Sequence, residues 1–206
     1  MNKNLLLIFT RNPELGKVKT RLAKGVGDKA ALEIYKFLVA HTHNITKDLP
    51  CAKYVYYSEC IHENDIWDRT NYVKKMQSGA DLGMRMKKAF QEGFRDGFEN
   101  IIIIGSDMLD LTPQDLEMAF KSLNDNDYVI GPAADGGYYL LGMNVLNSDL
   151  FESKSWGTET VLADTLKDLN SYNLKMLEVK NDVDRLEDII GIDAFEHFLN
   201  NSNESK

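Results

Sequence analysis

The 206-residue sequence has few cysteines and no long apolar run. Its two cysteines, Cys51 and Cys60, are too few for a disulfide framework and stand in no metal-binding spacing, which favours a reducing compartment. The apolar run at residues 5–9 is too short for a signal peptide, and no run approaches the roughly 18 residues of a membrane span. We therefore expect a cytoplasmic protein with no membrane partner.

The sequence also lacks an excess of positive charge. Lys and Arg number 24 against 32 Asp and Glu, for a formal net charge of -8, which argues against a nucleic-acid partner. A content of 43% hydrophobic and 27% charged residues excludes bulk disorder. The length fits one domain, expected at residues 1–199 and followed by a flexible polar tail at 200–206. A monomer and a small homo-oligomer are both compatible with these features.

Short apolar runs alternate with longer amphipathic ones, which is typical of an α/β fold with a mostly parallel sheet. We expect strands at residues 5–10, 52–58, 73–77, 101–104, 128–131, 138–143 and 174–179. We expect helices at residues 28–47, from the cap Asp81 to residue 98, from the Thr112-Pro113 start onward, at 158–169 and at 185–199. Ligands of such sheets bind beyond the carboxyl ends of the strands, so the loops there are the first candidates for a site.

The loop after the first strand concentrates positive charge. Residues 11–24 contain five basic residues and one acidic residue, a local net charge of +4. Such a loop leading into a helix suits a phosphate or pyrophosphate, and a merely solvated loop is the alternative. It is not a Walker A loop, which would need Gly and Ser or Thr where Arg11 and Val18 stand, and Gly16 alone makes no dinucleotide fingerprint.

Aspartates follow the later strands. Asp107 comes shortly after residues 101–104 and suits Mg²⁺ or Mn²⁺ ligation, with an Asx turn as the alternative. In Asp182-Val183-Asp184, an extended backbone would direct both carboxylates to one face and so suit a divalent cation, whereas an N-cap would need only one of them. Asp135-Gly136-Gly137 predicts either a plain hairpin turn or a backbone that closely approaches a substrate.

Six segments match, in order, the pattern of a known family. They are Phe9-x-Arg11-x-Pro13-x-x-Gly16-x-x-Lys19-Thr20-Arg21-Leu22, Gln77-x-Gly79-x-Asp81-Leu82-Gly83-x-Arg85-Met86, Gly105-Ser106-Asp107, Gly131-Pro132-x-x-Asp135-Gly136-Gly137-Tyr138-Tyr139-Leu140-x-Gly142, Trp156-x-Thr158 and Asp182-Val183-Asp184. With these segments the chain resembles the glycosyltransferase-A-like family of radical-SAM/selenodomain-associated transferases, which is related to the 2-phospholactate and molybdenum cofactor guanylyltransferases. One departure is Leu109, where the family usually has proline two residues after the metal-binding aspartate.

The resemblance implies a nucleotide-diphospho-sugar transferase fold, Rossmann-like, with helices on both faces of a mostly parallel sheet and one antiparallel strand. It implies a nucleotide at Arg11, Gly16, Lys17, Lys19, Thr20, Arg21, Gln77, Gly79 and Arg85. It implies Mg²⁺ or Mn²⁺ at Asp107, with Asp182 or Asp184 as the second ligand. The acceptor, whose identity the sequence leaves open, would lie at Asp135, Gly136, Gly137, Trp156 and Thr158.

Two reactions fit these residues. A glycosyl group would leave an NDP-sugar, which the family favours, or a nucleotidyl group would leave an NTP with release of pyrophosphate, which the basic loop favours. In both, negative charge grows on phosphate oxygens, and we expect Lys17, Lys19, Arg21 and the ion at Asp107 to stabilise it. A nucleotide-binding module without catalysis is the third reading, because of Leu109 and because no general base is evident.

Overall fold

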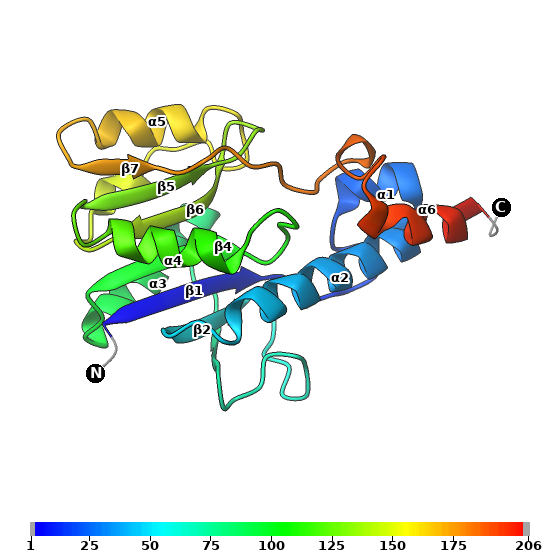
Figure 1. The fold of residues 1–206 in the computed structure, drawn as a ribbon, viewed down its shortest axis with the longest axis horizontal. Coiled ribbons are helices and arrows are strands. Elements are labelled where there is room, and N and C mark those ends of the chain that lie inside the picture. Colours follow the sequence, from blue (N-terminus) through cyan, green and yellow to red (C-terminus); the bar gives the residue numbers. More distant parts are fainter. Residues whose placement is uncertain (1–2, 204–206) are drawn as a thin grey trace.

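One seven-stranded sheet forms the centre of the computed structural model, which describes residues 3–203 (Figure 1). Its strand order is β3-β2-β1-β4-β6-β5-β7. The strands are β1 (Asn4–Thr10), β2 (Ala52–Tyr57), β3 (Val73–Met76), β4 (Asn100–Gly105), β5 (Tyr128–Pro132), β6 (Tyr138–Met143) and β7 (Leu174–Met176). Strand β6 runs antiparallel to β4 and β5, and the other neighbouring pairs are parallel. The predicted fold class, with its one antiparallel strand, is confirmed.

The central strands β1 and β4 are buried on both faces. Leu6 and Ile8 belong to one hydrophobic cluster, and Leu5 and Leu7 belong to a second one. This division follows from the strand itself, because successive side chains point to opposite faces of a sheet. Both faces therefore need a covering layer, and the uninterrupted apolar runs of these strands have that cause.

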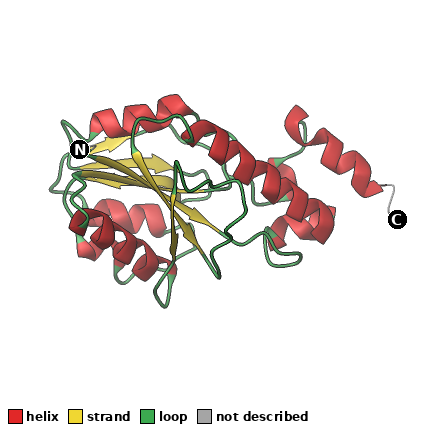
Figure 2. Cartoon of the chain, turned by 90° about the horizontal axis from the view of Figure 1, so that it is seen from below, coloured by secondary structure: helices red, strands yellow, loops and turns green. Residues whose placement is uncertain are grey.

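Helices supply both layers (Figure 2). Helices α2 (Asp28–Thr46) and α4 (Pro113–Ser122) contribute apolar side chains to the first cluster, and α3 (Leu82–Arg95) and α5 (Val161–Asp168) contribute them to the second. The predicted caps are confirmed, since the Asp81 side chain accepts a hydrogen bond from the Met84 amide and Thr112 forms a capping box with Asp115. Each cap satisfies amides that the first helical turn leaves without partners.

The carboxyl-terminal segment differs from the prediction. The single helix expected at residues 185–199 is wrong: the segment forms the short turns η2 (Leu186–Asp188) and η3 (Asp193–Phe195) and then α6 (Glu196–Asn203). Gly191 adopts a left-handed conformation (φ 77°), which interrupts a helix. Residues 200–203 of the expected flexible tail are helical, and residues 204–206 lie outside the described part of the chain.

A third cluster joins two segments that are distant in the sequence. Residues 11–27, expected as a loop, contain a short helix α1 (Thr20–Val26), whose Leu22 and Val26 pack against α2 and against Val183 and Phe195. This cluster lies at the end of α2 away from most of the sheet, where α1 and α6 are seen together in Figure 1. It brings the basic loop beside residues 182–184.

A last short turn, η1 (Ser148–Phe151), packs against α3 and α5. Among residues 3–203, no helix combines the length and the apolar character that a membrane crossing requires.

Candidate active site

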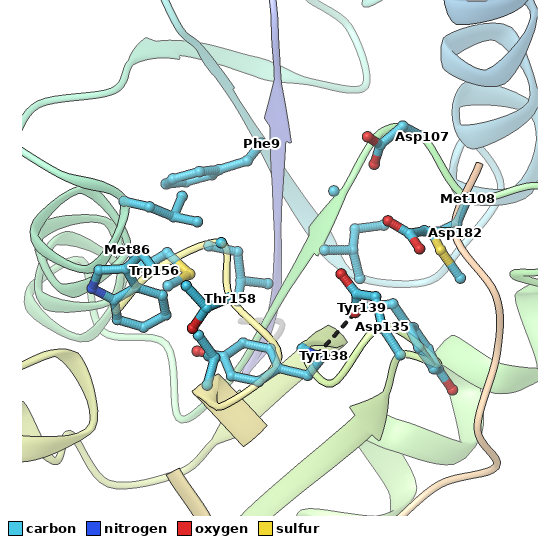
Figure 3. A pocket seen from close by; sticks show the side chains of 18 residues that line it. Phe9, Met86, Asp107, Met108, Asp135, Tyr138, Tyr139, Trp156, Thr158 and Asp182 are labelled. Carbon is cyan, nitrogen blue, oxygen red and sulfur yellow. Dashed lines mark hydrogen bonds between the residues drawn. The ribbon is translucent and has the colours of Figure 1, made fainter. Parts of the chain in front are cut away.

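Two cavities adjoin at the carboxyl ends of β1 and β4. The loop cavity, of about 810 Å³, is lined by Phe9, Thr10, Arg11, Asn12, Lys17, Lys19, Thr20, Arg21, Tyr35, Ser58, Glu59, Gln77, Asp81, Leu82, Arg85, Gly105, Ser106, Asp107 and Asp184. The aromatic pocket, of about 260 Å³, is lined by Phe9, Leu82, Met86, Ile103, Ile104, Gly105, Asp107, Met108, Ala133, Asp135, Gly137, Tyr138, Tyr139, Trp156, Gly157, Thr158, Val161 and Asp182 (Figure 3). They share Phe9, Leu82, Gly105 and Asp107, so one ligand can extend across both.

Most residues predicted for the nucleotide line the loop cavity. Arg11, Lys17, Lys19, Thr20, Arg21, Gln77 and Arg85 do so, whereas Gly16 and Gly79 do not. The two glycines have a conformational role instead. Gly16 has φ 74°, and a Cβ on Gly79 would lie 2.8 Å from the Arg85 amide nitrogen.

Sequence reasoning missed two residues that hold the basic loop in place. Asn12 is buried, donates to the Cys60 carbonyl over 2.8 Å and accepts from the Glu59 amide over 2.9 Å. The Tyr35 hydroxyl accepts from the Arg11 amide over 2.8 Å and lies 3.2 Å from Ser106 Oγ. Burial raises the pKa of Tyr35, which keeps this hydroxyl protonated. Asn12 stands at an unspecified position of the first matched segment and Tyr35 lay in an ordinary helical pattern, so neither residue gave a local signal.

Gln77 and Arg85 close the far wall of the loop cavity. The Gln77 amide nitrogen donates to the Thr10 and Tyr56 carbonyls over 3.2 and 3.0 Å. Arg85 donates from Nε to the Gly79 carbonyl over 3.2 Å and from Nη1 to Gln77 Oε1 over 3.4 Å. These bonds fix the segment against the ends of β1 and β2.

Three cations of the basic loop are paired with carboxylates, of which only Glu14 belongs to the loop itself. Lys17 Nζ lies 2.7 Å from Glu14 and 3.5 Å from Glu59. Arg21 Nη1 lies 2.7 Å from Asp184 Oδ2. The local charge of +4 that the sequence shows is therefore partly compensated in the fold by Glu59, Asp184 and Asp107, and an incoming anion would exchange with these carboxylates.

Lys19 is held most firmly. Its ammonium group donates to Asp107 Oδ2 over 2.7 Å, and its side chain is 5% exposed. Its backbone is left-handed, with φ 47° and ψ 43°, at the residue that precedes α1. A non-glycine residue in this conformation costs of order 1–3 kcal/mol, which surrounding contacts have to offset. The ion pair with Asp107 is one such contact.

Three carboxylates line the aromatic pocket. Figure 3 shows Asp107, Asp135 and Asp182 on one side, with Phe9, Met86 and Trp156 on the other. Burial, and next the nearby Asp135, raise the pKa of Asp182 to about 6, with smaller increases from Asp107 and Asp184, while Lys19 lowers it. The pocket thus holds more negative charge than the folded chain compensates.

This shift predicts that Asp182→Asn stabilises the protein at neutral pH. The Asp182 pKa is higher in the folded chain, about 6 against 3.8, so its favourable contribution exists below pH 3.8 and is lost as pH rises through about 6. This difference corresponds to about 3 kcal/mol at most, and solvent screening of the partly exposed carboxylate reduces it. We expect the variant to gain roughly 1–2 kcal/mol in unfolding free energy at pH 7.5, and to match the parent near pH 4. Urea denaturation at both pH values in EDTA measures this; an equal gain at both pH values would contradict it.

The Asp135-Gly136-Gly137 segment closes the hairpin between β5 and β6, as one of its two readings predicted. Asp135 Oδ1 accepts from the Gly137 amide over 2.9 Å, which is an Asx turn, and Asp135 also lines the aromatic pocket. Gly136 has φ 88°, and a Cβ there would lie 2.3 Å from the Glu159 carbonyl oxygen. This approach places the segment with Trp156 and Thr158 against the hairpin.

Gly136→Ala is therefore expected to destabilise the protein by about 2–4 kcal/mol, through the left-handed backbone and the clash with Glu159 together. Gly157→Ala is the matched control, since Gly157 has φ 80° but no atom lies within 4 Å of the position that an added Cβ would take. It should cost only about 1 kcal/mol. Thermal denaturation of both compares them, and equal losses would show that the clash is relieved without cost.

The sequence and fold match known proteins over most of the chain. A family model matches residues 41–158. The chain belongs to the family DUF2064, described as "Uncharacterized protein conserved in bacteria". The matched family segment includes Gln77, Arg85, Asp107 and Asp135, and it ends before Asp182. No curated protein matches the sequence.

Solved structures extend this result to the whole fold. The chain is 28% identical to a protein from Desulfovibrio desulfuricans G20 described as a "putative nucleotide-diphospho-sugar transferase", with a TM-score of 0.87 over 99% of this chain and 96% of that one. A cytidylyltransferase from Leptospira borgpetersenii is 14% identical, with a TM-score of 0.60 over 91% and 84%. Rv0371C from Mycobacterium tuberculosis H37Rv in complex with manganese is 12% identical, with a TM-score of 0.54 over 96% and 98%.

These likenesses show the nucleotide-diphospho-sugar transferase fold. The 28%-identical protein also supports an enzyme of the transferase class. The closer relation to radical-SAM-associated transferases and to the two guanylyltransferases stays a prediction. Leu109, which departs from the family pattern of the sequence analysis, has a packing role in this DUF2064 member, because it is partly buried against the cluster of α1 and α2.

The structure gives arguments both for and against the predicted metal site. Across residues 3–203, no group of three or more His, Cys, Asp or Glu side chains is placed to hold an ion. Asp107 is bonded to Lys19 and Asp184 to Arg21, while Asp182 faces the pocket with a raised pKa. Hard carboxylate oxygens nevertheless suit Mg²⁺ or Mn²⁺, and Mg²⁺ is commonly held by one or two carboxylates together with substrate phosphates. The donor chemistry fits an ion that arrives with a nucleotide.

Proposed function

We propose that this protein is a metal-dependent transferase of the glycosyltransferase type, with an NDP-sugar as donor. The observation that carries this proposal is the contact between the loop cavity, with Lys17, Lys19 and Arg21, and the pocket that holds Asp107 and Asp182. The donor phosphates would lie at the cations of the loop cavity, and the transferred group would point toward the aromatic pocket. The acceptor would bind there, at Asp135, Gly136, Gly137, Trp156 and Thr158.

The chain's own residues would stabilise the leaving nucleotide. As the donor bond breaks, negative charge grows on the phosphate oxygens, and Lys17 and Arg21 offer ammonium and guanidinium donors there. Both already hold carboxylates at 2.7 Å, so they are oriented before the phosphates replace those partners. Asp107 with Asp182, or with Asp184 in its place, would hold Mg²⁺ or Mn²⁺, which when bound neutralises further phosphate charge.

Nucleotidyl transfer from an NTP is the second candidate. Five basic residues line the loop cavity, namely Arg11, Lys17, Lys19, Arg21 and Arg85, and its volume of about 810 Å³ leaves room for a triphosphate. The fold is also that of a cytidylyltransferase. In this reaction the same cations would stabilise the leaving pyrophosphate.

Donor consumption separates the candidates. We would incubate the protein with each NTP and, separately, with UDP-, GDP- and CDP-sugars, in Mg²⁺, Mn²⁺ or EDTA, and measure pyrophosphate and NDP release. NDP release that stops in EDTA supports glycosyl transfer, and pyrophosphate release supports nucleotidyl transfer. Nucleotide binding unaffected by EDTA, without turnover, would instead indicate a binding module.

A further inference from the structure

The aromatic pocket is lined by acids and by no base. Of the eighteen described residues that form its wall, three are acidic, namely Asp107, Asp135 and Asp182, and none is Lys, Arg or His. The adjoining loop cavity has five basic residues in its wall, beside four acidic ones. The cationic side chains that could bind an anion therefore all line the loop cavity, on one side of the shared residues Phe9, Leu82, Gly105 and Asp107.

An anionic group would be poorly received in the aromatic pocket. Asp135 has no ion-pair partner among the salt bridges of the described residues, and Asp182 has none either. A phosphate or carboxylate placed beside Asp135 would meet like charge where no Lys, Arg or His lines the wall, and such a juxtaposition typically weakens binding by more than tenfold. The loop cavity is the side that suits the phosphates of the donor.

The rest of the wall suits a ring with an apolar face. Trp156 packs directly on α3, where a Cβ on Gly83 would lie 2.3 Å from its Nε1, so this ring is held in place. Phe9, Met86 and Trp156 stand opposite the carboxylates in Figure 3. Aromatic and apolar walls bury the apolar surface of a ligand, while a few placed polar groups fix its orientation. Carboxylates accept hydrogen bonds and donate none when ionised, so the matching ligand groups are donors such as hydroxyls.

We propose that the acceptor of this site is an uncharged polyhydroxy ring, such as an unphosphorylated sugar. This inference rests on the proposed function and adds the acceptor class to it. The ring would lie against Trp156 and its hydroxyls would donate to Asp135, while Asp107 and Asp182 remain available to the divalent ion of the proposed function. The negative charge of the donor phosphates would stay in the loop cavity. A phosphorylated acceptor, as the resemblance to guanylyltransferases would suggest, is disfavoured by the same charges.

Binding to matched sugars tests the acceptor class. Glucose, galactose, mannose and ribose, together with the 2-amino forms of the three hexoses and the terminal-carbon phosphates of all four, are titrated into the full chain with Mg²⁺ and a saturating nucleoside diphosphate. Saturation-transfer NMR measures the affinities. We expect at least one neutral sugar to bind, and its phosphate to bind more than tenfold more weakly. Tighter binding of the phosphorylated or amino form, or no neutral sugar bound, would overturn the acceptor class.

A variant isolates the charge of the pocket. Asp135→Asn retains the side-chain oxygen that forms the Asx turn with Gly137, and it removes one negative charge. We expect this variant to reduce the difference in affinity between a neutral sugar and its phosphate. Glu159→Gln, at an exposed residue outside the aromatic pocket, should leave that difference in affinity unchanged. If Asp135→Asn left this difference in affinity unchanged, the result would count against the proposal. Nucleotide affinity is measured in the same samples, and its absence would refute the proposed function rather than the acceptor class alone.

Discussion

Asp107→Asn is expected to lower donor turnover by about a hundredfold to a thousandfold, the range typical for loss of one preorganised charge contact in a transition state. Asp107 is shared by the loop cavity and the aromatic pocket, at the end of β4. Asparagine has nearly the same shape, but it neither neutralises Lys19 nor offers a charged oxygen to a divalent ion. Steady-state turnover, with the donor that the release assays identify, measures the loss.

A nearby aspartate provides the control for this variant. Asp110 is exposed, lies three residues further along the same loop and lines neither cavity, so Asp110→Asn should keep turnover within about twofold of the parent. Nucleotide-induced thermal stabilisation, measured with and without Mg²⁺, is the second readout. If Asp107→Asn kept both its turnover and the effect of Mg²⁺ on this stabilisation, the role proposed for Asp107 would be wrong.

The sequence was informative wherever local physics decides the structure. The uninterrupted apolar runs of β1 and β4 predicted two-sided burial, and Asp81 and Thr112 stand at the helix starts that their side chains cap. It also indicated that the loops after β1 and β4 would meet, because parallel neighbouring strands end at one edge. These features depend on neighbours in sequence or on a general rule of sheet topology.

Partners that are distant in sequence could not be predicted in the same way. Arg21 and Asp184 are separated by 163 positions, and their ion pair depends on the cluster that Val183 and Phe195 form with α1 and α2. The compensation of the basic loop follows from such pairs, which is why a count over residues 11–24 overstated its free charge. The left-handed backbone of Lys19 could not be predicted either, because lysine has no preference for that conformation.

Lys19 has a strained backbone, a buried side chain and a charge that pairs with Asp107. Two different substitutions separate the effect of the charge from that of the strain. Lys19→Met and Lys19→Gly both remove the ammonium group that holds Asp107 at 2.7 Å. A hydrogen bond to a charged group contributes about 1.5–3 kcal/mol, so we expect nucleotide affinity to fall about tenfold to a hundredfold in both variants. Lys24→Ala, exposed on α1 and within the same basic segment, should leave the affinity unchanged.

The two Lys19 variants should differ in stability. Glycine adopts φ near 47° without steric cost, whereas methionine keeps the strain, so Lys19→Gly should be more stable than Lys19→Met by about 1 kcal/mol. For a chain of this size that difference corresponds to roughly 2–4 °C in Tm. Calorimetric titration of the nucleotide and thermal denaturation measure the two effects on the same samples. Equal Tm values would show that the strain is relieved in the variants, and retained affinity would mean that Lys19 orders the loop without contacting the phosphates.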